Sequence, residues 1–352
     1  MFLQLQINNI MMNNLIKPLL FATSFFILLC SCEKEIFGLP YSDQPIDNFE
    51  SLWSEFDQLY GLFKVRNISW DSIYQVYRPQ VNNDMSEEEL YELLIAVLAS
   101  LDDSHVGLLP TDSPLPQFQS GIGGRIDTIR DFSLDVVKGH YLAEAHSNDP
   151  FTYGFLTHEI GYLHIAWEPD ENTVDKQMED VIAHLSSASA IVVDIRNNTG
   201  GEDRGGQAIA SYFTDEERLY MTNSIKNGPG PDDFTAPMEW YIRPKGFTFN
   251  QPLVLLTNRV TVSAGETLAL AMRTLPQLTS VGDTTTGAFS NAVPRELPNG
   301  WLYTLSIGDW RAADGTSYEG IGLAPDIRVL NTSAALLQGQ DQCLETAIEL
   351  LR

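Results

Sequence analysis

Residues 190–201 read Ala-Ile-Val-Val-Asp-Ile-Arg-Asn-Asn-Thr-Gly-Gly, an apolar run that passes through polar residues into two glycines. The apolar part, 190–195, predicts a fully buried strand of the kind that parallel sheets contain. Gly200 and Gly201 lack a Cβ, so their backbone N–H groups can point into a cavity, as an oxyanion hole requires. Taken alone, the segment also fits an ordinary strand-to-helix turn.

Buried strands and amphipathic helices alternate on both sides of this segment, which indicates an α/β core. We expect this core to occupy residues 161–352. The patterns predict strands at 161–166 and 252–257 and helices at 174–187, 205–213 and 264–275.

The residues ahead of the core predict two smaller units. Apolar residues recur three and four positions apart over 47–60, and residues 86–89 form a capping box before another apolar helix. We therefore expect a small helical N-terminal subdomain over 45–106. The Gly- and Pro-punctuated stretch 107–160 alternates in part, most clearly at 132–137, and predicts a small β-rich connector.

The N-terminus carries a targeting signal. Lys17 stands before the apolar run 19–29, which is too short to cross a bilayer comfortably and predicts a signal peptide. The Leu-Cys-Ser-Cys that ends at Cys32 resembles a bacterial lipoprotein box, in which that Cys is acylated. We expect a signal peptide over 1–32, a tether over 33–44 and a lipid anchor in the bacterial cell envelope, facing the periplasm or the cell surface. The alternatives are an uncleaved anchor and an ordinary signal peptide.

Charge and side-chain inventory exclude several classes of function. The chain has 21 Lys and Arg against 47 Asp and Glu, a net charge of -26, which repels nucleic acid. If Cys30 is removed and Cys32 acylated, Cys343 alone remains, so neither a disulfide nor a thiolate metal site is expected. The histidines lack metal-site spacing and no phosphate-binding loop is present, so we predict no metal and no cofactor.

A serine stands at a second strand-to-helix junction, in Thr-Val-Ser-Ala-Gly-Glu at 261–266. The N-terminus of the following helix supplies free N–H donors and a positive dipole to Ser263. Because Glu266 follows three residues later, Ser263 also satisfies the spacing of a capping box. The segment alone therefore fits a helix cap as well as a nucleophile.

Four segments together resemble the carboxy-terminal-processing, or tail-specific, protease family in order and spacing. The resemblance spans roughly 161–327 and implies that Ser263 is the nucleophile on an α/β core of the crotonase- and ClpP-like spiral type. The four segments are 194–201, 261–266, 281–287 and 318–326.

Two departures from the main branch of that family point to its tricorn-core-like branch. The Lys that the main branch places after its Thr-x-Gly motif is replaced here by Ala288, and the chain has no Lys after Lys245. The stretch 107–160 is also too short for the usual inserted PDZ domain. A Ser–Lys mechanism therefore lacks its general base.

The tricorn-core-like branch uses a Ser–His–Ser–Glu tetrad, and the resemblance assigns each role to a residue of this chain. Ser104 and His105 follow the N-terminal helices and match the Ser-His pair, and Glu319 matches the acid. His105 would take the proton of Ser263 and deliver it to the leaving amine. Glu319, through Ser104, would hold the imidazole in the tautomer that the base requires.

The sequence therefore predicts a serine peptidase that acts on peptides or unfolded proteins, with Gly200 or Gly201 and Ala264 as oxyanion donors worth about 3 kcal/mol each. The alternative is a non-catalytic binding module for apolar ligands or peptides, because the fold also resembles the vertebrate retinoid-binding modules. A third possibility is a lipoprotein that presents this domain as part of an assembly. The oligomeric state stays open.

Overall fold

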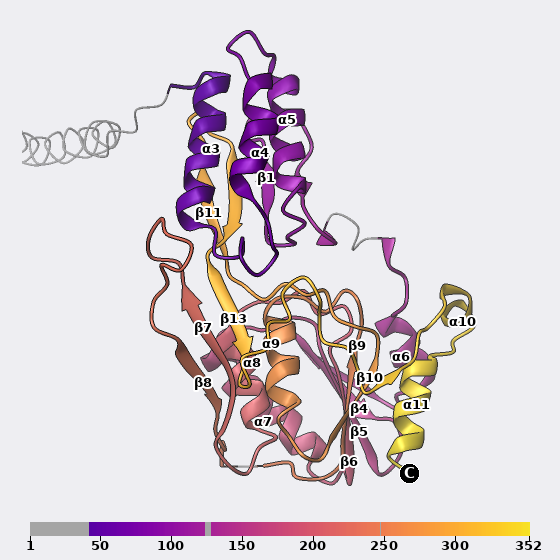
Figure 1. Ribbon diagram of the computed structural model, residues 1–352. Helices are drawn as coiled ribbons and strands as arrows, with labels where there is room; N and C mark the ends of the chain where they lie inside the picture. Colours follow the sequence, from indigo (N-terminus) through magenta and orange to yellow (C-terminus); the bar gives the residue numbers. More distant parts are fainter. Residues whose placement is uncertain (1–41, 124–127, 247) are drawn as a thin grey trace, which may run out of the picture.

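The computed structural model describes residues 42–123, 128–246 and 248–352 and consists of two bodies joined by extended chain (Figure 1). The larger body contains a seven-stranded sheet with helices on both faces. Its strands from β14 to β5 run parallel, and β4 and β3 are added antiparallel at one edge. In spatial order they are β14 (Ile327–Arg328), β10 (Leu278–Gly282), β9 (Leu253–Thr257), β6 (Ala190–Asp194), β5 (Ile160–Ile165), β4 (Phe151–Phe155) and β3 (Ala145–Asn148).

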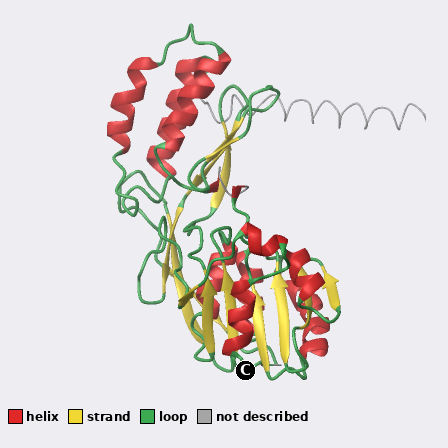
Figure 2. Cartoon of the chain, turned by 90° about the vertical axis from the view of Figure 1, so that its right-hand side faces the viewer, coloured by secondary structure: helices red, strands yellow, loops and turns green. Residues whose placement is uncertain are grey.

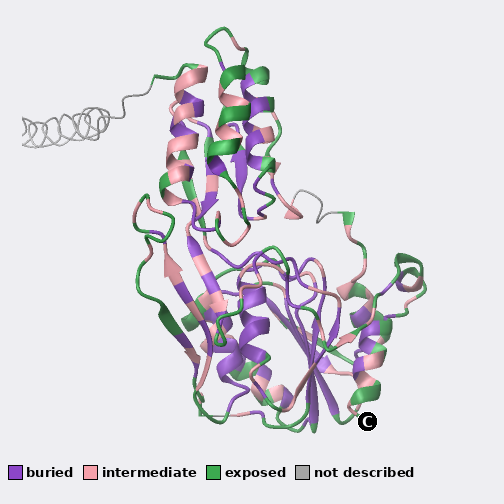
Figure 3. Cartoon of the chain, in the orientation of Figure 1, coloured by how far each residue is buried: buried purple, intermediate pink, exposed green. Residues whose placement is uncertain are grey.

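The central strands are buried on both faces, as their continuous apolar sequences predict (Figure 3). Ile191 and Val193 of β6 join one apolar cluster, and Val192 between them joins the cluster on the opposite face. The first cluster includes α7 (Glu171–Leu185), α8 (Asp203–Ser211) and α9 (Ala264–Met272). The second includes α6 (Leu134–His140) and α11 (Gln342–Leu350), and α10 (Ser333–Leu337) lies beside them.

The smaller body packs N-terminal helices on a four-stranded antiparallel sheet with its own apolar core (Figure 2). The capping box of residues 86–89 begins α5 as predicted. Its helices are α3 (Pro45–Leu59), α4 (Trp70–Tyr77), η1 (Arg78–Gln80) and α5 (Glu87–Ala99), and its strands in spatial order are β11 (Ala292–Glu296), β12 (Leu302–Ser306), β1 (Gly107–Leu109) and β2 (Phe118–Gln119).

A three-stranded antiparallel sheet runs beside α8 and α9 and connects the two bodies. It consists of β13 (Gly308–Ala312), β7 (Arg218–Ile225) and β8 (Met238–Ile242), and β13 follows directly from β12. The chain between β10 and β14 therefore leaves the larger body, completes the sheet of the smaller one and returns.

The α/β class with a helical N-terminal subdomain is confirmed, and the strands and helices predicted between 161 and 275 form within a few residues of the expected positions. The strand expected at 132–137 is wrong, because α6 begins there. Ser133 caps that helix by accepting from the Val136 N–H at 3.4 Å, and Val137 turns inward to the sheet.

The stretch 107–160, expected as one β-rich connector, is divided between the two bodies. Strands β1 and β2 pair within the smaller sheet, and β3 and β4 extend the larger one. The pairing of β1 with β12 explains the division, because it joins Gly107 to Thr304 across most of the chain. Residues 292–306 thus complete the body that was expected to consist of 45–106 alone.

The predicted signal peptide, the lipidation site Cys32 and residues 33–41 of the tether lie outside the described residues. Among the described residues, no helix is long and apolar enough to cross a membrane. The lipid anchor therefore stays a prediction.

Candidate active site

Ser263 occupies the N-cap position of α9, at the end of the turn that follows β9. Its backbone has φ 57° and ψ -123°, a conformation that non-glycine residues rarely adopt and that is characteristic of functional turns. Gly200 packs directly against it, since a Cβ on Gly200 would lie 2.8 Å from the Ser263 Cβ. The side chain of Ser263 is half-buried at the positive end of the helix.

Glu266 fixes the turn that carries Ser263. Its Oε2 accepts from the Ser263 N–H at 3.2 Å, which is the reciprocal contact that the capping-box spacing predicts. The same carboxyl accepts from the N–H groups of Gly287 at 2.7 Å and Ala288 at 2.8 Å, and from the Thr285 hydroxyl at 2.5 Å. Burial raises the pKa of Glu266 to about 7, and these hydrogen bonds offset part of the rise.

The glycine pair of the 190–201 segment lies beside this turn. Gly200 and Gly201 have φ values of 81° and 154°, which glycine adopts without strain. The Gly200 N–H already donates to Asn198 Oδ1 at 2.8 Å. No acceptor bonds the Gly201 N–H among the described residues, and Ala264 lies in the first turn of α9, where N–H groups lack helical partners. Of the three predicted oxyanion donors, Gly201 and Ala264 are therefore the ones with an uncommitted N–H.

His105 is buried at the base of the smaller body, between α5 and β1. Its backbone N–H donates to Asp103 Oδ1 at 2.8 Å, and its carbonyl accepts from the Thr304 hydroxyl at 2.7 Å. The imidazole Nδ1 is buried and has no hydrogen-bond partner among the described residues. Burial lowers the pKa of the imidazole, which keeps it neutral and able to accept a proton at neutral pH.

Glu319 is buried and paired with a cation that the sequence did not single out. Arg66 donates to Glu319 Oε1 from Nε at 2.9 Å and from Nη2 at 2.5 Å, and the Phe289 N–H donates to Oε2 at 2.5 Å. Burial, followed by the negative charge of Asp103, raises the pKa of Glu319 to about 8, and Arg66 opposes this rise.

Arg66 connects Glu319 to the residues before His105, and Asp103 is held there by a separate contact. Arg66 Nη1 donates to the Asp102 carbonyl at 2.6 Å, and Asp103 Oδ2 accepts from the Tyr60 hydroxyl at 2.9 Å. Sequence reasoning missed Arg66 because 253 residues separate it from Glu319, whereas Asp103 stands next to the predicted Ser-His pair.

Two contacts of the predicted tetrad are absent in this conformation. Among the described residues, no hydrogen bond joins Ser263 to His105, and none joins Ser104 to Glu319. The Ser104 carbonyl instead accepts from Gln119 Nε2 at 2.5 Å, and its hydroxyl packs against Gly121. Hydrogen bonds between acting groups are often long in the absence of substrate and tighten on binding.

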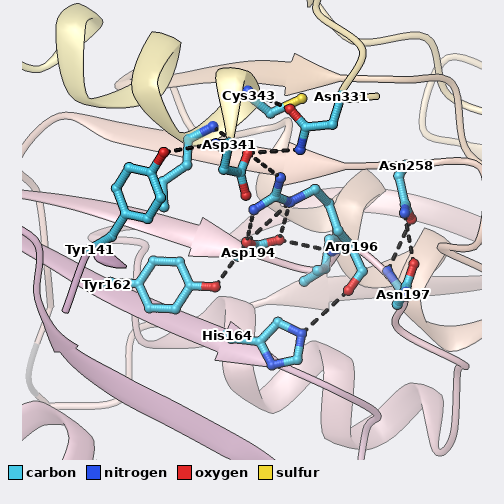
Figure 4. A network of polar contacts seen from close by, with 12 residues as sticks. Tyr141, Tyr162, His164, Asp194, Arg196, Asn197, Asn258, Asn331, Asp341 and Cys343 are labelled. Carbon is cyan, nitrogen blue, oxygen red and sulfur yellow. Dashed lines mark hydrogen bonds and ion pairs between the residues drawn. The ribbon is translucent and has the colours of Figure 1, made fainter. Parts of the chain in front are cut away.

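A buried ion cluster supports the loop that begins the glycine segment (Figure 4). Arg196 forms three hydrogen bonds from its guanidinium to Asp194 and one to Asp341, at 2.6 to 3.1 Å. Asp341 caps the N-terminus of α11, so the C-terminal helix is tied to the end of β6. The neighbouring Asn197 N–H donates to Asn258 Oδ1 at 2.9 Å, which joins this loop to the one that leads to Ser263.

The described part of the chain contains no cluster of His, Cys, Asp or Glu that could hold a metal ion.

Comparisons with known proteins place the fold in one family. Residues 159–329 match peptidase family S41, and residues 44–99 match the Tricorn protease C1 domain. The crystal structure of a candidate peptidase from Parabacteroides merdae aligns with a TM-score of 0.77 at 30% identity and covers 88% of this chain and 96% of that chain. The chain belongs to peptidase family S41. The Tricorn match covers α3 to α5 of this S41 chain, in accord with the tricorn-core-like branch.

The S41 chain is also similar to curated processing proteases. It is 27% identical over 158 residues to carboxy-terminal processing protease CtpA of Bacillus subtilis, a match that covers 44% of this chain and 32% of the relative. It is 28% identical over 167 residues to the carboxyl-terminal-processing protease of Synechocystis, covering 47% and 37%. The match thus spans about a third of the length of these relatives. The resemblance noted from the four segments is confirmed, and the individual roles of the site residues stay predictions.

Proposed function

We propose that this S41 chain is a serine peptidase in which Ser263 attacks the scissile carbonyl of a peptide or an unfolded protein. The observation that carries the proposal is Ser263 itself. It stands in a strained turn at a helix N-terminus, against Gly200, in a chain of peptidase family S41. These are the features that expose a hydroxyl beside donors for a developing oxyanion.

In the proposed reaction His105 accepts the Ser263 Oγ proton as the Oγ–carbon bond forms. The N–H groups of Gly201 and Ala264 receive the oxyanion. His105 then gives the proton to the leaving amine as the C–N bond breaks, and a water molecule, activated in the same way, releases the acyl group from Ser263. This step requires the His105 imidazole to reach the Ser263 hydroxyl, and no hydrogen bond joins the two side chains among the described residues.

Glu319 completes the proposed tetrad by stabilising the imidazolium that forms on His105, through Ser104. Support for this role comes from its burial and from the Arg66 contact that ties it to the segment before His105. The lysine base of the family's main branch has no counterpart here, since Ala288 follows the Thr-x-Gly motif and the chain has no Lys after Lys245.

The proposed place of action is the bacterial cell envelope, with the protein held to a membrane by a lipid on Cys32. The apolar run 19–29 and the lipoprotein-box pattern support this placement. Net charge -26 argues that the lipid rather than electrostatic attraction provides the membrane contact.

A non-catalytic binding module is the second candidate, and the missing Ser263–His105 hydrogen bond is the observation that favours it. The two candidates differ in amide hydrolysis. We expect the purified full chain to cleave an unfolded protein such as reduced casein, with cleavage lost in a Ser263→Ala variant of unchanged melting temperature. Equal cleavage by the two proteins would end the peptidase proposal, and co-purification of an apolar ligand with an inert wild type would favour the binding module.

A further inference from the structure

Glu168 is a fully buried carboxyl beside the glycine pair, and no role in the reaction has been given to it. It lies in the loop between β5 and α7, with none of its surface exposed. Its Oε1 accepts from Asn198 Nδ2 at 2.7 Å, and its Oε2 is buried with no hydrogen-bond partner among the described residues. A buried, half-satisfied carboxyl is costly unless it is protonated or has a function.

The contacts of Asn198 lead from Glu168 to both sides of the predicted oxyanion hole. Asn198 Oδ1 accepts from the Gly200 N–H at 2.8 Å, and the Asn198 carbonyl accepts from the Val262 N–H at 3.2 Å. The first contact fixes the backbone of the glycine pair, and the second fixes the backbone of Val262, the residue before Ser263. Asn198 Nδ2 also donates to the Ile165 carbonyl at 3.0 Å, so its amide orientation is fixed from two directions.

The backbone of Glu168 holds the glycine pair directly as well. Its N–H donates to the Gly200 carbonyl at 3.3 Å, and its carbonyl accepts from the Glu202 N–H at 2.9 Å, which forms a short parallel bridge to Gly201. A Cβ on Gly201 would lie 2.2 Å from the Glu168 carbonyl oxygen, so only glycine fits there. The orientation of the Gly201 N–H therefore depends on Glu168.

The electrostatic surroundings of Glu168 disfavour its ionised form. Burial raises its pKa to about 8, the Asn198 hydrogen bond opposes the rise, and the charge of Asp203 at the start of α8 adds to it. No cation contacts the Glu168 carboxyl among the described residues. A negative charge here would lie next to the loop that must receive an oxyanion.

We propose that Glu168 is a positioning residue for the oxyanion hole, which in its protonated form holds Asn198 and the Gly200–Gly201 loop and on ionisation opposes the negative charge of the tetrahedral intermediate. The inference rests on the proposed peptidase function, since it concerns the same site. It assigns no bond-making step to Glu168, which acts through Asn198 and the glycine pair.

Two variants test this role with a fluorophosphonate probe, whose attack by Ser263 also places negative charge in the oxyanion hole. Glu168→Gln keeps an acceptor for Asn198 and cannot ionise, whereas Glu168→Leu removes the acceptor. For Glu168→Leu we expect the maximal rate of labelling to fall roughly tenfold to hundredfold, with the probe half-saturation concentration unchanged. This loss is smaller than the loss of about 10²–10³ that follows removal of a whole oxyanion donor, because the donors themselves remain.

The pH dependence gives a readout that a purely structural role would not move. Glu319 titrates in the same range, so the quantity to follow is the ratio of the Glu168→Gln rate to the wild-type rate. We expect this ratio to rise about tenfold from pH 6 to pH 9, as follows if the ionised form of a group with a pKa of about 8 is inactive. Glu239→Gln, an exposed Glu-to-Gln change on β8, is the matched control and its ratio stays flat.

The outcomes separate this inference from the function on which it rests. A wild type that does not label overturns both. A wild type that labels on Ser263, with a flat Glu168→Gln ratio, overturns the inference and leaves the peptidase proposal standing. Melting temperatures at pH 6 and pH 9 accompany each rate, and if Glu168→Leu does not fold, the Gln ratio decides alone.

Discussion

Replacing Arg66 with methionine removes a buried cation whose Nε and Nη2 both donate to Glu319. The two side chains are 9% and 1% exposed, so solvent screens the pair only weakly. At 2.9 Å and an effective dielectric constant of 20 the attraction is roughly 6 kcal/mol, an upper bound because Glu319 can take up a proton instead. Removal of one partner of a buried pair costs about 3–5 kcal/mol, and we expect a loss of this size in the free energy of unfolding.

Urea unfolding at pH 9, above the pKa of about 8 of Glu319, measures the loss, and Arg243→Met provides the matched control. Arg243 pairs with Glu217 at side-chain exposures of 60% and 52%, so its removal should cost less than about 1 kcal/mol. Glu319→Gln combined with Arg66→Met should recover part of the loss, with a coupling energy of about 1 kcal/mol or more. The reasoning is refuted if Arg66→Met is as mild as the control, or if the two site variants are additive.

Three further predictions follow from the site. Gly200→Ala places a methyl group 2.8 Å from the Ser263 Cβ at a φ of 81° and should lower probe labelling at least about tenfold. The control Gly315→Ala, at a φ of 85° with no atoms near the new methyl group, should cost only about 1 kcal/mol of backbone strain and label normally. Equal labelling of the two variants would contradict the packing argument. Burial lowers the pKa of His105, so the labelling rate should fall to half its maximum only below pH 6.5 as the pH is lowered. A half-maximal point at or above pH 6.5 would count against His105 as the buried base. Glu168 keeps its proton up to about pH 8 when folded and loses it near 4.5 when unfolded, so its contribution to stability is present below 4.5 and is lost as pH rises to 8. The free energy of unfolding, measured with urea between pH 5 and pH 8, should therefore fall with pH, and Glu168→Gln should reduce this slope by up to about 1.4 kcal/mol per pH unit; an unchanged slope would show that Glu168 is already ionised in the folded state.

The α/β core could be predicted from sequence because its signals are local. Each strand and helix from 161 to 275 shows its own periodicity, and the junctions carry glycines or a capping box. The 132–137 segment has an alternating pattern too short to distinguish a strand from a helix, and the Ser133 cap decided for the helix. The pairing of β12 with β1 is non-local and leaves no signal in either segment alone.

In the candidate site too, the residues with local sequence signals could be predicted and those that depend on non-local contacts could not. Ser263, Gly200 and Ala264 fall together because each stands at the end of a core strand or the start of the next helix, where parallel strands deliver their loops to one edge. Arg66 gave no signal in the sequence, because it acts through an ion pair with Glu319, which lies 253 residues away in the chain. Glu168 also gave no signal, because its burial depends on the packing of the loop after β5 against the glycine pair.

The most direct test of the central claim is to label the detergent-solubilised full chain with a fluorophosphonate and to locate the modified residue by peptide mass spectrometry. We predict a single modified serine, Ser263, with no labelling in Ser263→Ala, normal labelling in the control Ser224→Ala on β7, and a fall of at least about a hundredfold in His105→Ala, the contribution of a general base. Modification of another serine, or undiminished labelling of a folded Ser263→Ala protein, would contradict the assignment of Ser263 as the nucleophile.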